Sequence, residues 1–162
     1  MNNLETFLMN NNISPDKVKF HSFENSTHTA EEAAQRLSCG LNQIVKSLII
    51  MVKTAEEEDF PMLVLVPGPK RLRQRLIRKV LKDQLNIQAL DSRLATQDEV
   101  LELTGYQVGG VPPISLNMQS LMDSDLENES VLYGGGGTAT TIIEIPTNLV
   151  KKLSKPVIGS IC

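Results

Sequence analysis

Two apolar segments that lie close together place the strongest constraint on how this chain folds. Residues 44–52 read IVKSLIIMV, and residues 61–67 read PMLVLVP. Both are rich in Ile, Val and Leu at consecutive positions, a pattern typical of strands buried on both faces. The acidic segment TAEEEDF (54–60) lies between them and indicates an exposed connection. We therefore expect a hairpin of two central strands.

Helices are predicted on both sides of this hairpin. Two capping boxes, in which Thr is followed three residues later by Glu, open helices at about 29–38 and 96–104. Residues 70–85 carry apolar side chains at helical spacing, which predicts an amphipathic helix. The capping pairs are Thr29 with Glu32 and Thr96 with Glu99; the expected helix ends lie near Gly40 and Gly105, and the apolar positions are Leu72, Leu76, Ile77, Val80, Leu81 and Leu85.

The remaining segments complete an α/β or α+β pattern. NIQAL (86–90) is a candidate short strand, TTIIEI (140–145) is a β-branched strand, and PTNLVKKL (146–153) is a short helix with Pro146 near its start. The chain has 162 residues, of which 41% are hydrophobic and 22% charged. This composition suits one globular domain over residues 1–162, built around a mixed sheet.

Targeting and redox signals favour a cytoplasmic location. The chain has no apolar run of about 18 residues, and its start, MNNLETFLMNNNIS, lacks the basic region and cleavage pattern of a signal peptide. Cys39 and Cys162 form neither a disulfide framework nor a metal-binding spacing. We expect both thiols to be inert and the protein to have no membrane partner.

Positive charge is concentrated in one segment, although the formal net charge is −3. Residues 70–82, KRLRQRLIRKVLK, hold seven of the sixteen Lys and Arg residues and no acid. On the predicted helix, Arg71, Arg75, Arg78 and Lys82 share one side. This side is either a solvated face or a surface that binds the phosphates of a polyanion such as tRNA. A membrane-surface helix is disfavoured because the apolar face has no aromatic residue.

The segment YQVGGVPPISL (106–116) places two glycines before two prolines. A hairpin turn at Gly109-Gly110 would need a returning strand, but Pro112 and Pro113 lack the N–H groups that pair strands. The alternative is a surface loop. Its amides would approach a ligand at the glycines, and the prolines would keep it rigid.

Lys46 is the one charged residue in the first apolar segment. In a strand it shares a face with Ile44, Leu48, Ile50 and Val52. Its ammonium group either extends from the strand to water or stands at the mouth of a cavity. In the second case it could bind a phosphate or an ester oxygen, or act as a base if burial lowers its pKa.

Other candidate motifs are weaker. A dinucleotide-binding function for Gly134–Gly137 is disfavoured because a strand, not a helix, follows the glycines; they form a turn or bulge, or the backbone wall of a site. His21 and His28 lack partners for a zinc site, and His28 either contacts a bound anion or only caps the next helix. Without a nucleophile motif, a hydrolase would use a positioned water and backbone amides as oxyanion donors.

Taken in order, HTAEEAAQRL, IVKSLII, TGYQVGGVPPISL, the glycine run and IIEIP resemble the YbaK/ProX family. Its members are free-standing relatives of the editing domain of bacterial prolyl-tRNA synthetases, and the resemblance covers about residues 15–158. It implies one α/β domain on a mixed, highly twisted, barrel-like sheet with flanking helices. The implied activity is hydrolysis, without metal or cofactor, of the ester that links alanine or cysteine to tRNA for proline.

The resemblance also implies roles for individual residues. Lys46 would hold the terminal adenosine and the ester, and the N–H groups of Gly110 and Val111 would stabilise the oxyanion. Some members carry a tyrosine where this chain has Phe23, so the choice of amino acid stays open. Further substrate contacts are expected at His28, Thr29, Gly109, Pro112, Pro113, Ile114, Gly135, Gly136 and Thr138.

Two functional hypotheses follow. The first is a trans-acting aminoacyl-tRNA deacylase in which the base for the attacking water is either a protein group or the adjacent ribose hydroxyl. The second is a module that binds tRNA or aminoacyl-adenosine without turnover. A prolyl-tRNA synthetase is a possible partner, and the sequence does not predict the oligomeric state.

Overall fold

The computed structural model describes residues 3–26, 29–56 and 58–162. In these residues the strands form a five-stranded sheet, in the order β4-β2-β3-β5-β8, and a three-stranded sheet, in the order β1-β7-β6. The strands are β1 (Lys19–Ser22), β2 (Val45–Lys53), β3 (Phe60–Pro67), β4 (Asp91–Leu94), β5 (Ser120–Asp123), β6 (Val131–Gly135), β7 (Thr141–Pro146) and β8 (Val157–Gly159). The helices are α1 (Asn3–Asn10), α2 (Ala30–Leu37), α3 (Gln74–Leu85), α4 (Gln97–Thr104) and α5 (Thr147–Ser154), with 3-10 turns η1 (Leu41–Gln43) and η2 (Ser124–Asn128).

The predicted central hairpin is confirmed. β2 and β3 pair antiparallel along their lengths, with Lys46 opposite Val66. β5 and β8 extend the sheet in parallel, whereas β4 pairs antiparallel with β2, so the sheet is mixed as expected. The strands do not close into the expected single barrel-like sheet. An isolated bridge between Ile44, which directly precedes β2, and Tyr133 of β6 joins the two sheets.

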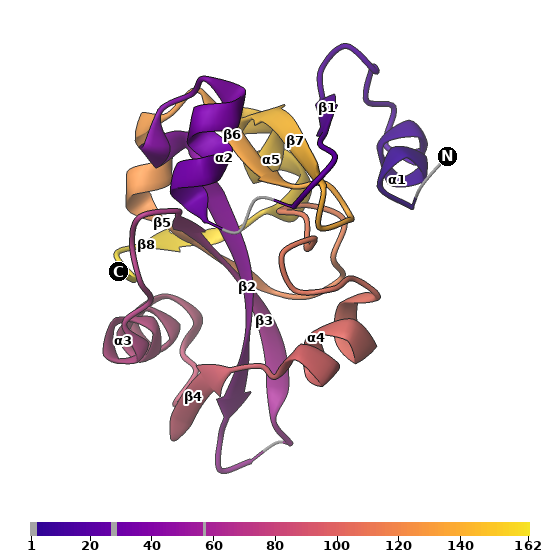
Figure 1. Ribbon diagram of the computed structural model, residues 1–162. Helices are drawn as coiled ribbons and strands as arrows, with labels where there is room; N and C mark the ends of the chain where they lie inside the picture. The colour runs from indigo at the N-terminus through magenta and orange to yellow at the C-terminus, as the bar shows by residue number, and fades with distance from the viewer. Residues whose placement is uncertain (1–2, 27–28, 57) are drawn as a thin grey trace.

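Both faces of β2 are buried, which explains its continuous apolar sequence. Val45 and Ile49 belong to a core that contains α4 residue Val100, and Ile50 belongs to a second core with Ile77 of α3. Figure 1 shows α3 and α4 on opposite sides of the β2–β3 hairpin. Burying one such aliphatic side chain stabilises a fold by about 1.5–3 kcal/mol, so these two layers hold the centre of the molecule together.

The capping boxes predict their helices well. The Thr29 hydroxyl accepts a hydrogen bond from the N–H of Glu32 (3.1 Å), although α2 ends at Ser38, in the left-handed conformation (φ 54°), rather than near Gly40. The second box is complete, and Gly105 ends α4 as predicted. The strand at 140–145 and the helix at 146–153 are also confirmed, as β7 and α5.

The helix predicted over 70–85 begins later, at Gln74. The Arg73 N–H donates to the Ile161 carbonyl (2.9 Å), and this bond holds residue 73 in an extended conformation (φ −114°, ψ 109°). Lys70 instead closes a turn onto Pro67. Arg71 is therefore on a connection before α3, not on the helix where the sequence pattern places it.

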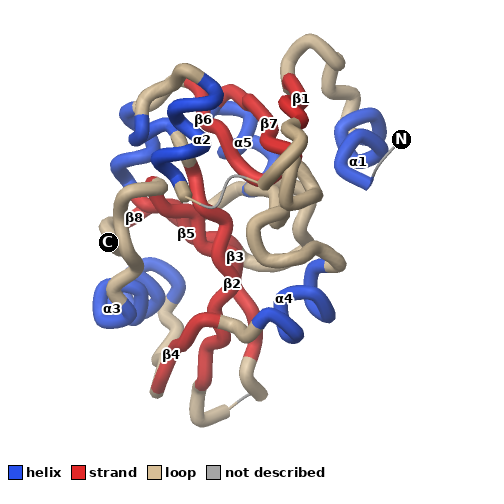
Figure 2. The backbone as a smooth tube through the Cα atoms, in the orientation of Figure 1, coloured by secondary structure: helices blue, strands red, loops and turns tan. Residues whose placement is uncertain are grey.

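Several short elements were not predicted. NIQAL is not a strand; the four residues that follow it form β4, at the edge of the sheet. Figure 2 shows β4 and the connecting loops beside the long β2–β3 hairpin. None of the helices in the described parts of the chain combines the length and the apolar character needed to cross a bilayer.

Candidate functional site

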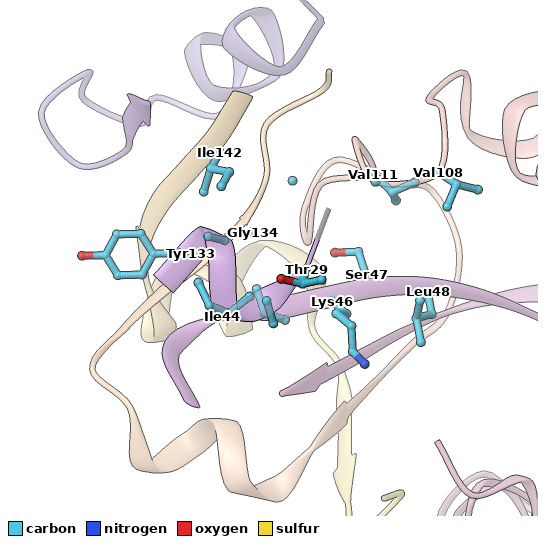
Figure 3. A pocket seen from close by; sticks show the side chains of 15 residues that line it. Thr29, Ile44, Lys46, Ser47, Leu48, Val108, Val111, Tyr133, Gly134 and Ile142 are labelled. Carbon is cyan, nitrogen blue, oxygen red and sulfur yellow. The ribbon is translucent and has the colours of Figure 1, made fainter. Parts of the chain in front are cut away.

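A cavity of about 270 Å³ lies where four separate segments meet (Figure 3). It is lined by the start of α2 (Thr29, Ala30, Ala33), residues 44–48, the loop residues Val108, Gly109 and Val111, and the β6–β7 residues Tyr133, Gly134, Gly135 and Ile142. This volume is close to the lower end of the range of about 300–1,000 Å³ for small-molecule sites. The walls are mostly apolar, which suits a small ligand group.

The cavity follows the stretch of β2 between the Ile44–Tyr133 bridge and the beginning of its pairing with β4. β4 pairs with β2 from Ile50 onward, and Ala95 adds a bond to the Ile49 carbonyl (2.9 Å). The Ile44 carbonyl accepts from Gly68 on the β3 side (2.7 Å). Because main-chain groups alternate in direction along a strand, those of Val45 and Ser47 point away from β3. The main-chain N–H and carbonyl of Ser47 can therefore donate and accept hydrogen bonds with a ligand.

Ser47 is a site residue that the sequence analysis missed. Its hydroxyl is buried and has no hydrogen-bond partner among the described residues. Figure 3 places it on the side of β2 that faces Val111. Leaving a buried polar group unsatisfied costs about 1–3 kcal/mol, so a ligand that bonds to this hydroxyl would recover that energy. The sequence carries no signal for it, because only the structure shows that this hydroxyl lacks a partner.

Lys46 lines the cavity, but its ammonium group points away from Ser47 and Val111 (Figure 3). It donates to the Lys70 carbonyl (2.7 Å). Burial lowers the pKa of Lys46, and the nearby Arg71 lowers it further, against opposing effects of Cys162 and Glu31. The structure does not show this ammonium facing the loop amides. The half-buried cation is instead held beside the β3–α3 connection.

The loop that follows α4 is more buried than expected. Gly109 lines the cavity with φ of 91°, which favours glycine. Val111, Pro112, Pro113 and Ile114 are buried, so this stretch is not a surface loop. Of these four, Val111 lines the cavity; the prolines and Ile114 pack behind it and do not line it. The hairpin interpretation is excluded because no strand follows the glycines directly.

One expected oxyanion donor is committed elsewhere. The Gly110 N–H donates to the Gln107 carbonyl (2.9 Å), closing a turn. This bond contradicts a role for that N–H as a free donor to a substrate. The N–H of Val111 has no acceptor within the described residues and is available.

The glycine run packs against the Gly109–Val111 loop, backbone to backbone. A Cβ on Gly135 would lie 2.2 Å from the Val111 carbonyl oxygen, and one on Gly110 would lie 3.1 Å from the Thr138 backbone. The Gly137 N–H donates to the Gly110 carbonyl (2.9 Å). Gly134 and Gly135 are thus a backbone wall of the cavity, and the turn follows them. Gly136 and Thr138 bond within this turn and do not line the cavity.

The other predicted contacts lie around α2. Thr29 lines the cavity, although its hydroxyl caps the helix. Phe23 does not line it; its ring packs among apolar residues beneath the Arg36 guanidinium (5.7 Å). His28 lies outside the described residues. His21 bonds to Glu144 (3.0 Å) on the three-stranded sheet, and the Tyr133 ring points away from the other cavity side chains (Figure 3).

The four basic residues expected to bind tRNA do not all lie on one helix, because Arg71 precedes α3. Arg71 is exposed beside Lys70, whose carbonyl holds Lys46. Arg75 and Lys82 are exposed on α3, while Arg78 is half-buried and donates to the Ser92 hydroxyl (3.4 Å). No group of three or more His, Cys, Asp or Glu side chains is arranged to hold a metal ion in the part of the chain that the structure describes.

Comparisons with known proteins identify the family. Residues 24–153 match the family model described as the aminoacyl-tRNA editing domain. The chain is 26% identical to the uncharacterized protein YwhH of Bacillus subtilis over 134 residues, 82% of this chain and 78% of that protein. It is 31% identical to a proline–tRNA ligase of Thermotoga neapolitana over 108 residues, 67% of this chain but 17% of the ligase.

A solved structure supports the same assignment. A candidate trans-editing enzyme for prolyl tRNA synthetase superposes with a TM-score of 0.82 and 28% identity, over 98% of this chain and 93% of that one. The family model covers most of the chain, including every described segment that lines the cavity. The chain therefore belongs to the family of YbaK-like aminoacyl-tRNA editing domains.

Proposed function

We propose that this protein is a trans-acting deacylase that hydrolyses the ester of mischarged tRNA for proline, with alanine or cysteine as the amino acid. Family membership and the similarity to proline–tRNA ligases support this class of substrate. The observation that carries the proposal is the buried, unpartnered Ser47 hydroxyl on β2, a residue that lines the mostly apolar cavity. A small aminoacyl ester has the polar centre and the short side chain that such a site accepts.

The cavity suggests a role for each wall. Ala30, Ala33 and Ile142 would surround the amino acid side chain, while the Ser47 hydroxyl and the Val111 N–H would bond to the ester. A donor that strengthens its bond to the developing oxyanion contributes on the order of 3 kcal/mol. Selection among amino acids by size alone is weak, about 10- to 200-fold for one methylene group.

Lys46 would anchor the end of the substrate. Its ammonium already bonds to an acceptor, the Lys70 carbonyl (2.7 Å). A ribose or phosphate oxygen of the terminal adenosine could share or replace that acceptor. The described residues that line the cavity include no carboxylate and no imidazole. We propose the ribose hydroxyl next to the ester as the base for the attacking water.

A deacylation assay tests the proposal. Alanyl- and cysteinyl-tRNA for proline are mixed with the protein, and loss of the acyl group is followed against the spontaneous rate. Ser47→Ala and Lys46→Ala should each slow release at least about tenfold, given the 10²- to 10³-fold effect of single oxyanion donors. Lys53→Ala is the matched control, since Lys53 is exposed at the other end of β2. Wild-type release no faster than that of Lys46→Ala would refute the proposal.

Two observations favour the alternative, a module that binds without turnover. The Gly110 N–H and the Lys46 ammonium both have partners within the protein, which leaves fewer free groups for catalysis. Tight binding of a non-hydrolysable aminoacyl-adenosine, with no release in the deacylation assay, would select this function.

A further inference from the structure

We propose that the connection between β3 and α3 is the phosphate-binding rim for the RNA strand whose 3′ end enters the cavity. The rim consists of Lys70, Arg71 and Arg73 of this connection, together with Arg75 in the first turn of α3. This inference rests on the proposed function, and it assigns the path of the substrate outside the cavity. It replaces the basic helix face that the sequence pattern indicates.

The connection borders the cavity directly. The Gly68 N–H bonds to the Ile44 carbonyl (2.7 Å), and a Cβ on Gly68 would lie 2.6 Å from the Ala30 Cβ. Ala30 and Ile44 both line the cavity. A strand that leaves the cavity on this side therefore meets residues 68–73 first.

Lys46 links the cavity to the rim. Its ammonium donates to the Lys70 carbonyl (2.7 Å), and the Arg71 guanidinium lies near enough to lower the Lys46 pKa. The Lys46 ammonium and the Arg71 guanidinium thus lie near each other, beside the main chain of Lys70. An anion bound between them would relieve their mutual repulsion.

The charge of the rim is largely uncompensated within the protein. Lys70 forms an ion pair with Asp125, and Glu31 is the carboxylate that acts on Lys46. Arg71, Arg73 and Arg75 are exposed, and their guanidinium groups have no ion-pair partner among the described residues. The first turn of α3 contains no acidic side chain. Exposed cations without partners bind a phosphate backbone by releasing its counterions.

The rest of α3 is less well placed. Arg78 is held against β4 by its bond to Ser92. Each helical residue advances about 1.5 Å, so Lys82 lies roughly 12 Å further along the axis than Gln74, where α3 begins. The local positive surface nearest to the cavity is therefore the connection and the first residues of the helix.

A charge-reversal experiment tests the rim. Binding of unacylated tRNA for proline is measured by fluorescence anisotropy over a series of salt concentrations. The Arg71→Glu/Arg73→Glu variant should bind at least about tenfold more weakly, with the slope of log K against log salt reduced by roughly 1–2. The control, Lys79→Glu/Lys152→Glu, makes the same charge change at exposed residues of α3 and α5 and should stay within about twofold of wild type. An unchanged affinity and slope for the Arg71/Arg73 variant would overturn the inference.

A second substrate separates the rim from the cavity. Alanyl-adenosine carries the ester but no phosphate. A second variant, Arg73→Glu/Arg75→Glu, leaves Arg71 in place beside Lys46, so it should bind tRNA at least about tenfold more weakly and yet hydrolyse alanyl-adenosine at the wild-type rate. A matching loss with this substrate would show a damaged cavity and would also overturn the inference. If wild type itself leaves alanyl-adenosine and alanyl-tRNA intact, the proposed function fails, and the tRNA-binding result still decides the rim.

Discussion

Neighbouring residues of β2 serve different surfaces of this protein. Ser47 places a buried hydroxyl beside the cavity, while Lys46 reaches the opposite side of the strand and bonds to Lys70. The sequence alone predicts Lys46, because a charge stands out in an apolar strand. It does not predict Ser47, because a serine among aliphatic residues becomes informative only when its hydroxyl is seen to lack a partner.

The lowered pKa of Lys46 predicts an alkaline limit to activity. Burial is the main cause, and it moves the pKa below the ordinary value of 10.5. If the charged ammonium anchors the substrate, enzyme-catalysed release falls as pH rises through this lowered pKa. Lys46→Arg should move the limit to higher pH, because a guanidinium stays charged above pH 12. The measurement is the deacylation rate against pH, after subtraction of the spontaneous rate.

The same shift affects stability. Between the lowered pKa and 10.5 the unfolded state binds more protons at this position than the native state, so Lys46 makes stability rise with pH in that window. Activity and stability therefore change in opposite directions at alkaline pH. An alkaline limit at the same pH in wild type and Lys46→Arg would show that Lys46 does not anchor the substrate.

Contact between the β6–β7 hairpin and the Gly109–Val111 loop is what shapes the cavity. The wall depends on Gly135, because its backbone approaches the Val111 carbonyl too closely for any side chain. The two segments are well separated in the sequence. The sequence shows the glycines of both segments, but it does not show that their backbones pack against each other.

Gly135→Ala should separate these two elements. The added methyl group meets backbone atoms that cannot rotate away, so we expect a loss of about 1–3 kcal/mol, typical of overpacking. Gly40→Ala is the matched control: its Cβ would find its nearest neighbour at 3.4 Å, and its φ is −72°. Urea unfolding of both variants measures the difference. Equal stabilities for the two would contradict the close packing described here.

Elements were predictable where local signals were strong. The β2–β3 hairpin and α4 follow from apolar runs and a capping box, and both are confirmed. β5 was missed because its acid, Asp123, is buried and accepts bonds from Asp125 and Ile161, whereas acids in a sequence usually indicate exposure. β4 has four residues and β8 has three, too few to show the alternation of apolar and polar side chains that is typical of a strand.

For the molecule as a whole, the sequence predicted the class of fold and the family but not the shape of the site. The α/β class with a mixed sheet is confirmed; the strands of the described residues form two sheets, joined at Ile44 and Tyr133, where the resemblance implied one barrel-like sheet. The cavity depends on distances between four segments. Such distances come from tertiary packing, so sequence patterns could name Lys46, Gly109 and Val111 but could not place them relative to one another.

The direct test of this account is where an aminoacyl-adenosine binds. A non-hydrolysable alanyl-adenosine can be titrated into the labelled protein while backbone amide chemical shifts are recorded. The account predicts the largest changes at Ser47, Gly109 and Val111, with little change at Ser92 and Arg93, which line a separate hollow beside β4. Saturable changes near Ser92 and Arg93, with the amides of the cavity unmoved, would contradict it.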